Sequence, residues 1–287
     1  MKRILTVQDV SCVGKCALTV ALPVISACGV ETAVLPTALL STHTAFRHVA
    51  SADLSDRFEP IAEAWQAEGV TFDGLYTGYL ANERQIEAVL GIKERFLNPG
   101  APFFVDPVMA DDGKLYAGFS EGFVGAMRRL CAEADVTVPN ISEACLLLGV
   151  PYTHERLSER EIGDMLPGLT ALGCRAAFVT GVHFDADRIG YLGYEAETGG
   201  RFAYATPRYP VSFPGTGDVF ASAAFGAIAR GLPIGRAMPI AARFTYRSIG
   251  ATLSETPHNW YGVNFETALP ELIREIEKAE KGGPDDA

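Results

Sequence analysis

The stretch FFVDPVMADDGKLYAGFSEGFVGAMRRLCAEADVTVPNISEACLLL, residues 103–148, decides the fold class. Two short apolar runs, Phe103–Val105 and Val136–Val138, have the length and composition of buried strands. Each run is followed by a helical pattern, at Phe119–Cys131 and at Ile141–Leu148. A strand, a helix and a second strand in this order predict parallel strands that are joined by a crossover helix.

The same alternation continues in both directions along the chain. It predicts an α/β protein in which a central, mostly parallel sheet carries helices on both faces. Late in the chain, Ile189–Tyr194 and Arg201–Ala205 flank the turn sequence Glu197–Gly200, so a hairpin adds a small antiparallel piece. We expect one domain over residues 1–281 and a disordered tail over residues 282–287. The other predicted strands are Ile4–Gln8, Val34–Leu40, Gly74–Thr77 and Ala176–Thr180, and the other helices are Cys16–Cys28, Leu54–Ala67, Asn82–Phe96, Ile162–Leu172, Asp218–Ala229, Arg236–Gly250 and Phe265–Lys278.

The composition is that of a globular protein with an acidic surface. The 287 residues include 24 Lys and Arg against 35 Asp and Glu, a formal net charge of -11. This charge argues against duplex nucleic acid and an anionic membrane as main partners. The longest uncharged stretch, Cys16–Val30, is too short to span a bilayer, and we expect no secretory signal. Six cysteines without a Cys-x-x-Cys pair predict free thiols in a reducing cytoplasm.

The segment Pro214-Gly215-Thr216-Gly217-Asp218 precedes a helix of small residues and has the composition of an anion-binding turn. The glycines allow a tight turn, and we expect Gly217 to need a conformation open mainly to glycine. The first turn of the helix supplies unpaired N–H groups and a partial positive charge. Asp218 can then accept the proton of an alcohol that attacks a phosphoryl group. The alternative is structural: Asp218 is only an N-cap and the glycines form only a turn.

Two groups of polar residues follow the two strands quoted above. Asp106 and Asp111 come after the first strand, and Asn140 and Glu143 come after the second. Oxygen ligands at strand ends suit Mg²⁺ that is bound to phosphates. The alternative for Asn140 and Glu143 is a capping box at the start of the next helix, and both interpretations can hold together.

Together these motifs resemble those of the ribokinase-like superfamily and, within it, of the pyridoxal kinases. The resemblance extends from Ile4 to the last predicted helix. Residues 215–218 resemble the GTGD anion hole and catalytic base, residues 106–109 resemble the DPV segment, and residues 139–143 resemble the PNxxE motif for metal and phosphate. The superfamily resemblance implies a ribokinase-like fold and phosphoryl transfer from ATP.

The same resemblance implies a role for each residue of these motifs. Asp218 is the catalytic base, and Mg²⁺, which accompanies ATP, is held by Asp106 and Glu143. The N–H groups that stabilise the transferring phosphoryl group come from Gly215, Thr216 and Gly217. The implied ATP-binding residues are Asp111, Tyr116, Asn140, Glu143 and Thr180.

Three further segments resemble the substrate pocket of pyridoxal kinases. Residues 41–44 resemble the SNHT stretch that lines the pyridine pocket, residues 77–80 resemble the segment whose tyrosine lies near the ring, and residues 7–8 resemble the end of the first strand. The substrate-binding residues implied by this resemblance are Gln8, Asp9, His43, Thr44 and Tyr79.

The chain departs from the pyridoxal kinase pattern at three positions. Ala110 replaces a glycine, and Val138 replaces a threonine, which puts a monovalent-cation site in doubt. Asp9 replaces a serine. A carboxylate only accepts hydrogen bonds, so Asp9 favours a vitamer that donates a proton, such as the ammonium group of pyridoxamine. The alternative is that Asp9 caps a backbone N–H group in the loop Val10–Gly14.

These observations predict an ATP-dependent kinase that phosphorylates the 5′-hydroxymethyl group of a B6 vitamer: pyridoxal, pyridoxine or pyridoxamine. The resemblance also implies a homodimer, without a nucleic acid or a membrane as partner. One alternative is a hydroxymethylpyrimidine or sugar kinase of the same superfamily. A second is a non-catalytic nucleotide- or vitamer-binding protein.

Overall fold

A nine-stranded sheet forms the centre of the protein in the computed structural model, which describes residues 1–153 and 157–282. The predicted tail lies, apart from residue 282, outside the described residues. The strands of this sheet are β1 (Arg3–Ser11), β2 (Glu31–Leu40), β3 (Ser51–Asp53), β4 (Leu75–Thr77), β5 (Phe103–Val105), β8 (Val136–Thr137), β9 (Ala176–His183), β10 (Arg188–Glu195) and β11 (Gly200–Pro207). Two further strands, β6 (Ala110–Asp111) and β7 (Lys114–Leu115), lie outside it.

The sheet is mostly parallel, as predicted. Its order is β11-β10-β9-β8-β5-β4-β1-β2-β3, and the strands from β9 to β2 pair in parallel. The predicted hairpin forms β10 and β11 and adds the antiparallel piece at one edge. β3 pairs antiparallel at the other edge, and β6 and β7 form a separate antiparallel hairpin. The fold class predicted from the alternation of strands and helices is therefore confirmed.

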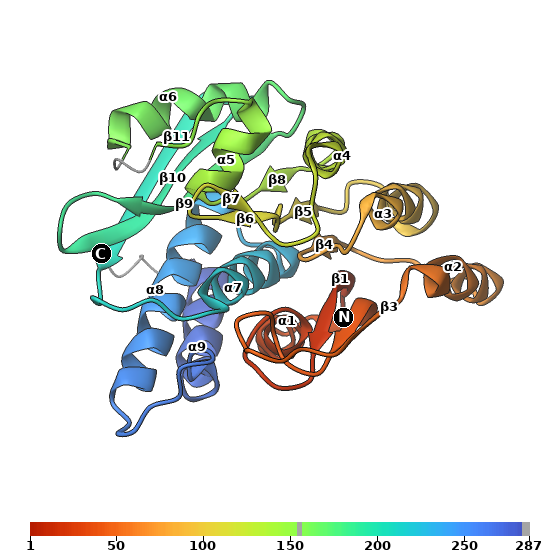
Figure 1. Ribbon diagram of the computed structural model, residues 1–287, viewed down its shortest axis with the longest axis horizontal. Helices are drawn as coiled ribbons and strands as arrows, with labels where there is room; N and C mark the ends of the chain where they lie inside the picture. Colours follow the sequence, from red (N-terminus) through yellow and green to blue (C-terminus); the bar gives the residue numbers. More distant parts are fainter. Residues whose placement is uncertain (154–156, 283–287) are drawn as a thin grey trace.

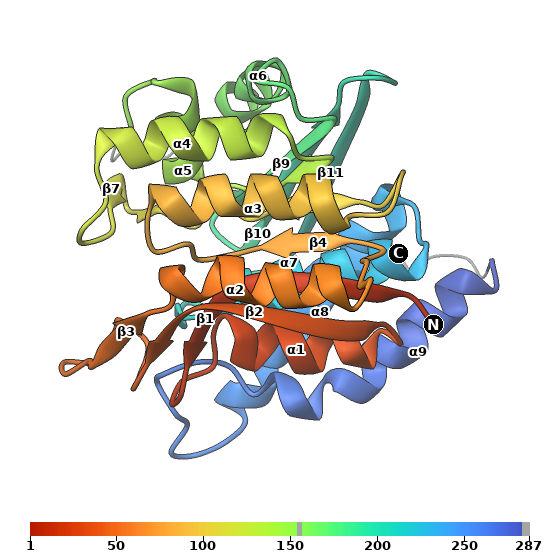
Figure 2. The same cartoon turned by 90° about the vertical axis from the view of Figure 1, so that its right-hand side faces the viewer.

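Helices cover both faces of the sheet (Figures 1 and 2). One hydrophobic core lies between the sheet and α1, α7, α8 and α9, and a second core lies between the sheet and α2 to α6. Because the parallel strands are apolar on both faces, they can be covered on both sides. The helices are α1 (Leu18–Ala27), α2 (Phe58–Ala67), α3 (Glu83–Phe96), α4 (Glu121–Ala132), α5 (Ile141–Leu148), α6 (Glu159–Thr170), α7 (Thr216–Arg230), α8 (Ile234–Leu253) and α9 (Leu269–Glu280).

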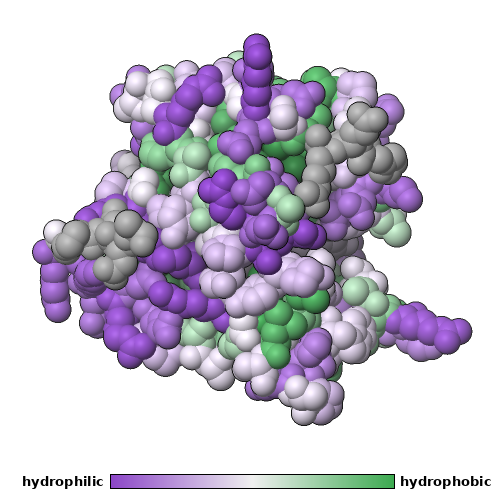
Figure 3. Space-filling view, turned by 90° about the vertical axis from the view of Figure 1, so that its left-hand side faces the viewer, coloured by the Kyte–Doolittle hydropathy of each residue, from purple (hydrophilic) through white to green (hydrophobic). Residues whose placement is uncertain are grey.

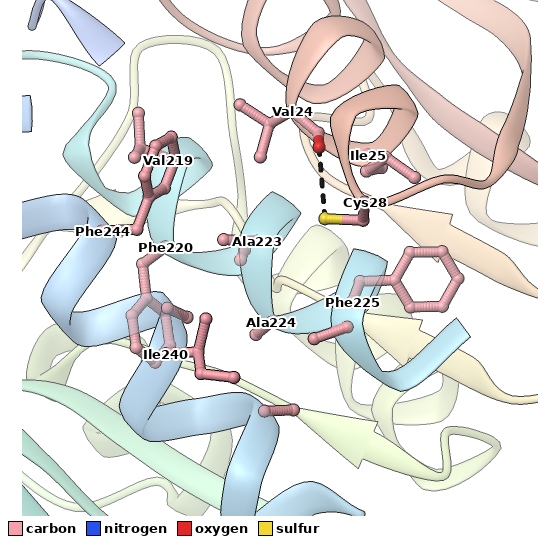
Figure 4. Packing of buried hydrophobic residues seen from close by; sticks show 14 of the residues in the cluster. Val24, Ile25, Cys28, Val219, Phe220, Ala223, Ala224, Phe225, Ile240 and Phe244 are labelled. Carbon is pink, nitrogen blue, oxygen red and sulfur yellow. Dashed lines mark hydrogen bonds between the residues drawn. The ribbon is translucent and has the colours of Figure 1, made fainter. Parts of the chain in front are cut away.

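Small residues bring α1 and α7 close together (Figure 4). A Cβ atom at Gly226 of α7 would lie 2.6 Å from the Sγ of Cys28, which follows α1. Ala223 and Ala224 of α7 are completely buried in the same core. A larger side chain at position 226 would therefore clash with Cys28 in this tightly packed contact.

An irregularity in the pairing of β1 with β2 lies next to Asp9. Gln8 pairs with Pro36, whereas Val10 pairs with Leu39, so β2 carries an extra residue at this point. A proline has no N–H group to donate to the ladder, and bulges of this kind redirect side chains near the ends of strands. The irregularity therefore lies beside Asp9, two residues before the end of β1.

The structure adds elements that the sequence analysis did not predict. β3, β6 and β7 have two or three residues each, too few to show a period-2 pattern. None of the helices in the described part of the chain combines the length and hydropathy needed to cross a bilayer. Figure 3 shows that hydrophilic residues prevail on one side of the molecule and that apolar residues there form small separate groups.

Candidate active site

The polar residues predicted to bind ligands meet at the carboxyl ends of the parallel strands. Asp9 lies in β1, Tyr79 and Asp106 follow β4 and β5, Asn140 follows β8, and Thr180 lies in β9. These strands are neighbours in the sheet, so their carboxyl ends form one edge. In sheets of this type, ligands bind outside that edge.

The turn before α7 has the geometry of an anion cradle. Gly215 is the N-cap of α7 with φ 79°, in the left-handed region, and α7 begins at Thr216. The N–H groups of the first helical turn have no acceptor within the helix, so they are available to an anion. The expectation about Gly217 was wrong, because Gly217 is not among the residues with positive φ and no atom lies within 4 Å of its ideal Cβ position. The conformation open mainly to glycine belongs to Gly215.

Asp218 lies in the first turn of α7 and is partly exposed. Burial among protein atoms raises the pKa of Asp218 to about 7, with a contribution from the charge of Asp9, while the N–H group of Ala17 lowers it. A carboxylate with a pKa near neutral is a suitable general base, because it can accept a proton and release it again. The N-cap of α7 is Gly215, and Asp218 is the third residue of the helix, so the alternative that Asp218 is the N-cap was wrong.

Asp106 and Glu143 form a buried pair of acidic side chains. Burial raises the pKa of both groups, and the charges of Glu143 and Asp218 raise the pKa of Asp106 further. Glu143 accepts hydrogen bonds from the N–H groups of Met109 and Asn140, at 3.1 and 2.9 Å. The predicted capping box is therefore present, since the Asn140 side chain also accepts from the N–H of Glu143.

The remaining residues predicted to bind ATP lie close to this pair or to Asn140. Asn140 donates to the carbonyl oxygen of Ala110 at 2.8 Å, which ties the β6–β7 hairpin to α5. Asp111 lies exposed in that hairpin, and Tyr116, which follows it, has its pKa raised by burial and by Glu143 and Asp111. Thr180 donates its N–H group to the carbonyl oxygen of Pro139 at 2.9 Å, next to Asn140.

The acidic pair suits a magnesium ion that arrives with phosphates. A cation relieves the repulsion between buried carboxylates, and Mg²⁺ usually keeps several waters while binding one or two carboxylates. Asp106 is the better candidate for direct contact, because both carboxylate oxygens of Glu143 accept backbone hydrogen bonds. Residues 1–153 and 157–282 contain no cluster of three or more His, Cys, Asp or Glu side chains that could hold a metal without further ligands.

Of the residues predicted to bind the substrate, Asp9 lies near Asp218, and Tyr79 lies near Asp9. Asp9 is only 6% exposed and accepts a hydrogen bond from the Ser11 hydroxyl at 3.0 Å. Burial raises the pKa of Asp9. The Tyr79 ring is partly buried and stacks on Phe119, with 5.7 Å between ring centroids. The charge of Asp9 contributes to the raised pKa of Tyr79, so the two side chains share one region.

Two predicted substrate residues have other partners in the structure. Gln8 is 0% exposed, and its side chain donates to the Thr6 hydroxyl at 2.8 Å, so the structure gives it no surface for a ligand. His43 is buried, with Nδ1 accepting from the N–H of Ala45 and Nε2 within 3.0 Å of the Tyr261 carbonyl oxygen. Both ring nitrogens are thus used within the protein. Thr44, in contrast, is exposed.

The sequence analysis missed the loop between β1 and α1, residues 12–17. The carbonyl oxygen of Lys15 lies against Gly215, and the N–H of Ala17 acts on Asp218. Both contacts use backbone groups, which carry no residue-type signature. The glycine at position 14 was the one available signal that this loop approaches another segment closely.

The chain is similar to known proteins over most of its length. The family described as phosphomethylpyrimidine kinase matches residues 20–261. The pyridoxal kinase PdxY of Rubrobacter xylanophilus is 29% identical over 270 residues, which cover 88% of this chain and 87% of the relative.

Solved structures are similar over almost the whole chain. The pyridoxal kinase from Lactobacillus plantarum is 31% identical, with a TM-score of 0.88 and coverage of 97% of this chain and 98% of that chain. A Bacteroides thetaiotaomicron protein, provisionally assigned as a phosphomethylpyrimidine kinase and crystallised with pyridoxal, is 33% identical. Its TM-score is 0.89, and the match covers 94% of this chain and 95% of that chain.

Proposed function

Since the chain belongs to the phosphomethylpyrimidine kinase family and, within the ribokinase-like superfamily, to the pyridoxal kinases, we propose that it transfers the γ-phosphoryl group of ATP to the 5′-hydroxymethyl group of a B6 vitamer. The observation that carries this proposal is Asp218, a carboxylate with a pKa near 7 in the first turn of a helix whose N–H groups are available to an anion. This arrangement supports the proposal, because a general base would then lie beside a bound phosphoryl group.

In the proposed reaction, the hydroxyl oxygen of the vitamer attacks the γ-phosphorus of ATP and its proton passes to Asp218. The bond between the γ-phosphorus and the bridging oxygen breaks, so ADP leaves with the bonding electron pair. The N–H groups of Gly215, Thr216 and Gly217 stabilise the charge on the transferring phosphoryl group. Bound Mg²⁺ would offset the charge of the phosphates, held by Asp106 and, through water, by Glu143.

On the nucleotide side, we propose that Asp111 and Tyr116 of the hairpin segment lie along the phosphates, with Thr180 and Asn140 behind them. The hydrogen bond from Asn140 to Ala110 supports this, because it fixes the hairpin over the acidic pair. Asp9, Thr44 and Tyr79 would contact the vitamer, whereas Gln8 and His43 would shape the pocket from behind.

Six free thiols, at positions 12, 16, 28, 131, 145 and 174, support the further proposal that the enzyme works in a reducing cytoplasm. We also propose a single domain over residues 1–281 and a homodimer, which light scattering after gel filtration would test.

The direct test is ADP release by the purified protein with ATP, Mg²⁺ and one of four acceptors: pyridoxal, pyridoxine, pyridoxamine or hydroxymethylpyrimidine. We expect turnover with the B6 vitamers and its loss in Asp218→Asn. Turnover with hydroxymethylpyrimidine alone would support the other kinase, and no turnover with tight vitamer binding would support a binding protein. Either result would overturn the proposal.

A further inference from the structure

Lys15, in the loop between β1 and α1, binds a segment close to the other end of the chain. Its ammonium group donates hydrogen bonds to the side-chain oxygen of Asn264 at 2.8 Å and to the carboxylate of Glu266 at 2.9 Å. The same group lies over the ring of Phe265, 5.8 Å from its centroid. The side chain of Lys15 therefore ties its loop to residues 261–266.

The backbone of Lys15 is held by the same segment. Its N–H group donates at 3.3 Å to the carbonyl oxygen of Tyr261, and this oxygen also lies 3.0 Å from Nε2 of His43. A Cβ atom at Gly262 would lie 2.4 Å from the Cβ of Lys15, so only a glycine allows the two segments to come this close. Three segments that are distant in the sequence thus meet around Lys15.

The segment that holds Lys15 is itself anchored. The N–H group of Asn264 donates to the hydroxyl of Thr252 in α8 at 2.7 Å, and both residues are buried. The side chain of Asn259 donates to the same Asn264 oxygen that accepts from Lys15, at 2.9 Å. Because Asn264 is fixed through its backbone and its side chain, it gives the ammonium group a rigid partner.

The carbonyl oxygen of Lys15 lies against the proposed anion cradle. It contacts Gly215, the N-cap of α7, at the point where a side chain of residue 215 would stand. At the end of the same loop, Ala17 has φ 48°, a conformation that persists only where the surroundings impose it. The shape of the loop, and with it the support for Gly215, therefore depends on contacts such as those of Lys15.

We propose that Lys15 is a positioning residue for the anion cradle. Its ammonium and N–H groups fix the loop to residues 261–266, and its carbonyl oxygen thereby holds Gly215 and the first turn of α7 in the place that phosphoryl transfer requires. This inference rests on the proposed function for its kinetic consequences, whereas its structural part concerns the ligand-free protein.

A lysine near an anion site can also bind the anion directly. In this structure the Lys15 ammonium already has two acceptors within 3 Å, and its side chain is only 20% exposed. Direct binding and positioning have different kinetic effects. Loss of a direct contact to ATP raises KM for ATP, whereas a displaced cradle lowers kcat, because the cradle acts on the transition state more than on bound ATP.

Lys15→Met removes the ammonium group and keeps a side chain that can pack against Phe265. We expect kcat to fall about tenfold, since small displacements of reacting groups are costly, while KM for ATP and for the vitamer each change less than about twofold. Lys15→Arg, which retains a positively charged donor, should restore at least about half of the wild-type kcat.

Lys93→Met is the matched control. Lys93 of α3 donates to the carboxylate of Glu133 at 2.7 Å and lies over the ring of Phe103, 5.5 Å from its centroid. Its side chain is 26% exposed, close to the value for Lys15. Phe103 is the first residue of β5, so this contact lies at the amino ends of the strands, away from the cradle. Both variants should lose similar stability, and only Lys15→Met should lose kcat.

Hydrogen exchange of the ligand-free protein, followed by NMR, tests the structural part without turnover. The amide of Val219 is the probe for the cradle, because it donates to the carbonyl oxygen of Gly215 at 3.0 Å. The amide of Lys15 is the probe for the loop. In Lys15→Met both amides should exchange about tenfold faster than in the wild type, since hydrogen bonds of a charged group are lost, and in Lys93→Met both should keep their rates.

The proposal is wrong if Lys15→Met leaves the exchange rate of Val219 unchanged, or if kcat falls equally in Lys15→Met and Lys93→Met. A higher KM for ATP with normal kcat would also overturn it and would assign Lys15 to nucleotide binding. If Lys15→Met does not fold, Glu266→Gln, which removes only the charge of the half-exposed partner, should show the same changes to a smaller extent, and their absence would overturn the proposal. If the wild-type protein has no kinase activity, the proposed function fails, while the exchange of Val219 still decides whether Lys15 holds the turn before α7.

Discussion

The backbone carbonyl oxygen of Lys15 lies 1.9 Å from the point at which Gly215 would carry a Cβ atom. The loop after β1 and the turn before α7, separated by 200 residues in the chain, thus fit together only because residue 215 has no side chain. Through this contact, the position of α7 and of Asp218 depends on the loop that also holds Ala17.

Gly215→Ala should destabilise the protein and abolish most activity. The added methyl group meets backbone, which cannot rotate away, and φ 79° is itself unfavourable for alanine. We expect a loss of at least about 1–3 kcal/mol in the free energy of unfolding, measured by urea denaturation. Gly69→Ala is the control, because Gly69 has φ 65° with no atom within 4 Å. Equal losses in the two variants would show that the contact with Lys15 is unimportant.

Gly217→Ala, unlike Gly215→Ala, should lower activity without lowering stability. Gly217 is exposed and its Cβ position is open, so the melting temperature should stay within about 1 °C of the wild type. If the phosphoryl group occupies that open space, kcat should fall at least about tenfold, because small displacements of reacting groups are costly. Normal kcat in this variant would place the phosphoryl group elsewhere.

Asp218→Asn should reduce kcat by about 10²–10⁴-fold, the usual contribution of a general base. The difference in stability between this variant and the wild type should grow as the pH rises. The folded-state pKa of about 7 lies above the unfolded value near 3.9, so the wild type loses stability as pH rises between these values. The variant lacks this loss, so its melting temperature should match the wild type near pH 4 and exceed it at pH 8. A variant less stable than the wild type at pH 8 would contradict the conclusion that the protein surroundings destabilise the charged form of Asp218.

Asp9→Ser should shift preference from pyridoxamine toward pyridoxal. The Asp9 carboxylate is buried, with the Ser11 hydroxyl as its side-chain donor, so a protonated amine would provide the charge it lacks. A charge-assisted hydrogen bond is stronger than a neutral one. The kcat/KM for pyridoxamine divided by that for pyridoxal should therefore fall about 3- to 10-fold. Asp9→Asn, which keeps the size and removes the charge, should behave similarly. An unchanged ratio in both variants would leave Asp9 as a partner of Ser11 in the loop.

Tyr79→Ala should raise KM for the vitamer by about 2- to 10-fold, the value of one aromatic contact, while KM for ATP stays nearly constant. Phe119→Ala is the control, because it removes the stacking partner of Tyr79 and leaves the tyrosine in place. A loss of melting temperature in Tyr79→Ala without any change in KM would mean that Tyr79 serves only the packing beside Phe119.

The parts of this protein that follow from local signals were predictable from the sequence. The apolar runs at 103–105 and 136–138, each followed by a helical period, led to the parallel sheet, and the turn at 197–200 led to the hairpin. Asp218 was found in the same way, because a glycine turn before a helix has a recognisable composition. These features depend on residues that are neighbours in the chain, so a single segment contains the information.

The tertiary structure alone decided which groups of the site are free to act. Gln8 and His43 occur in recognisable motifs, yet contacts with Thr6, Ala45 and Tyr261 engage the amide nitrogen of Gln8 and both ring nitrogens of His43. Gly215 rather than Gly217 needs positive φ, because Lys15, from the other end of the chain, lies beside it. Contacts between distant segments and between backbone atoms leave no pattern in the order of residues, and only the folded chain brings them together.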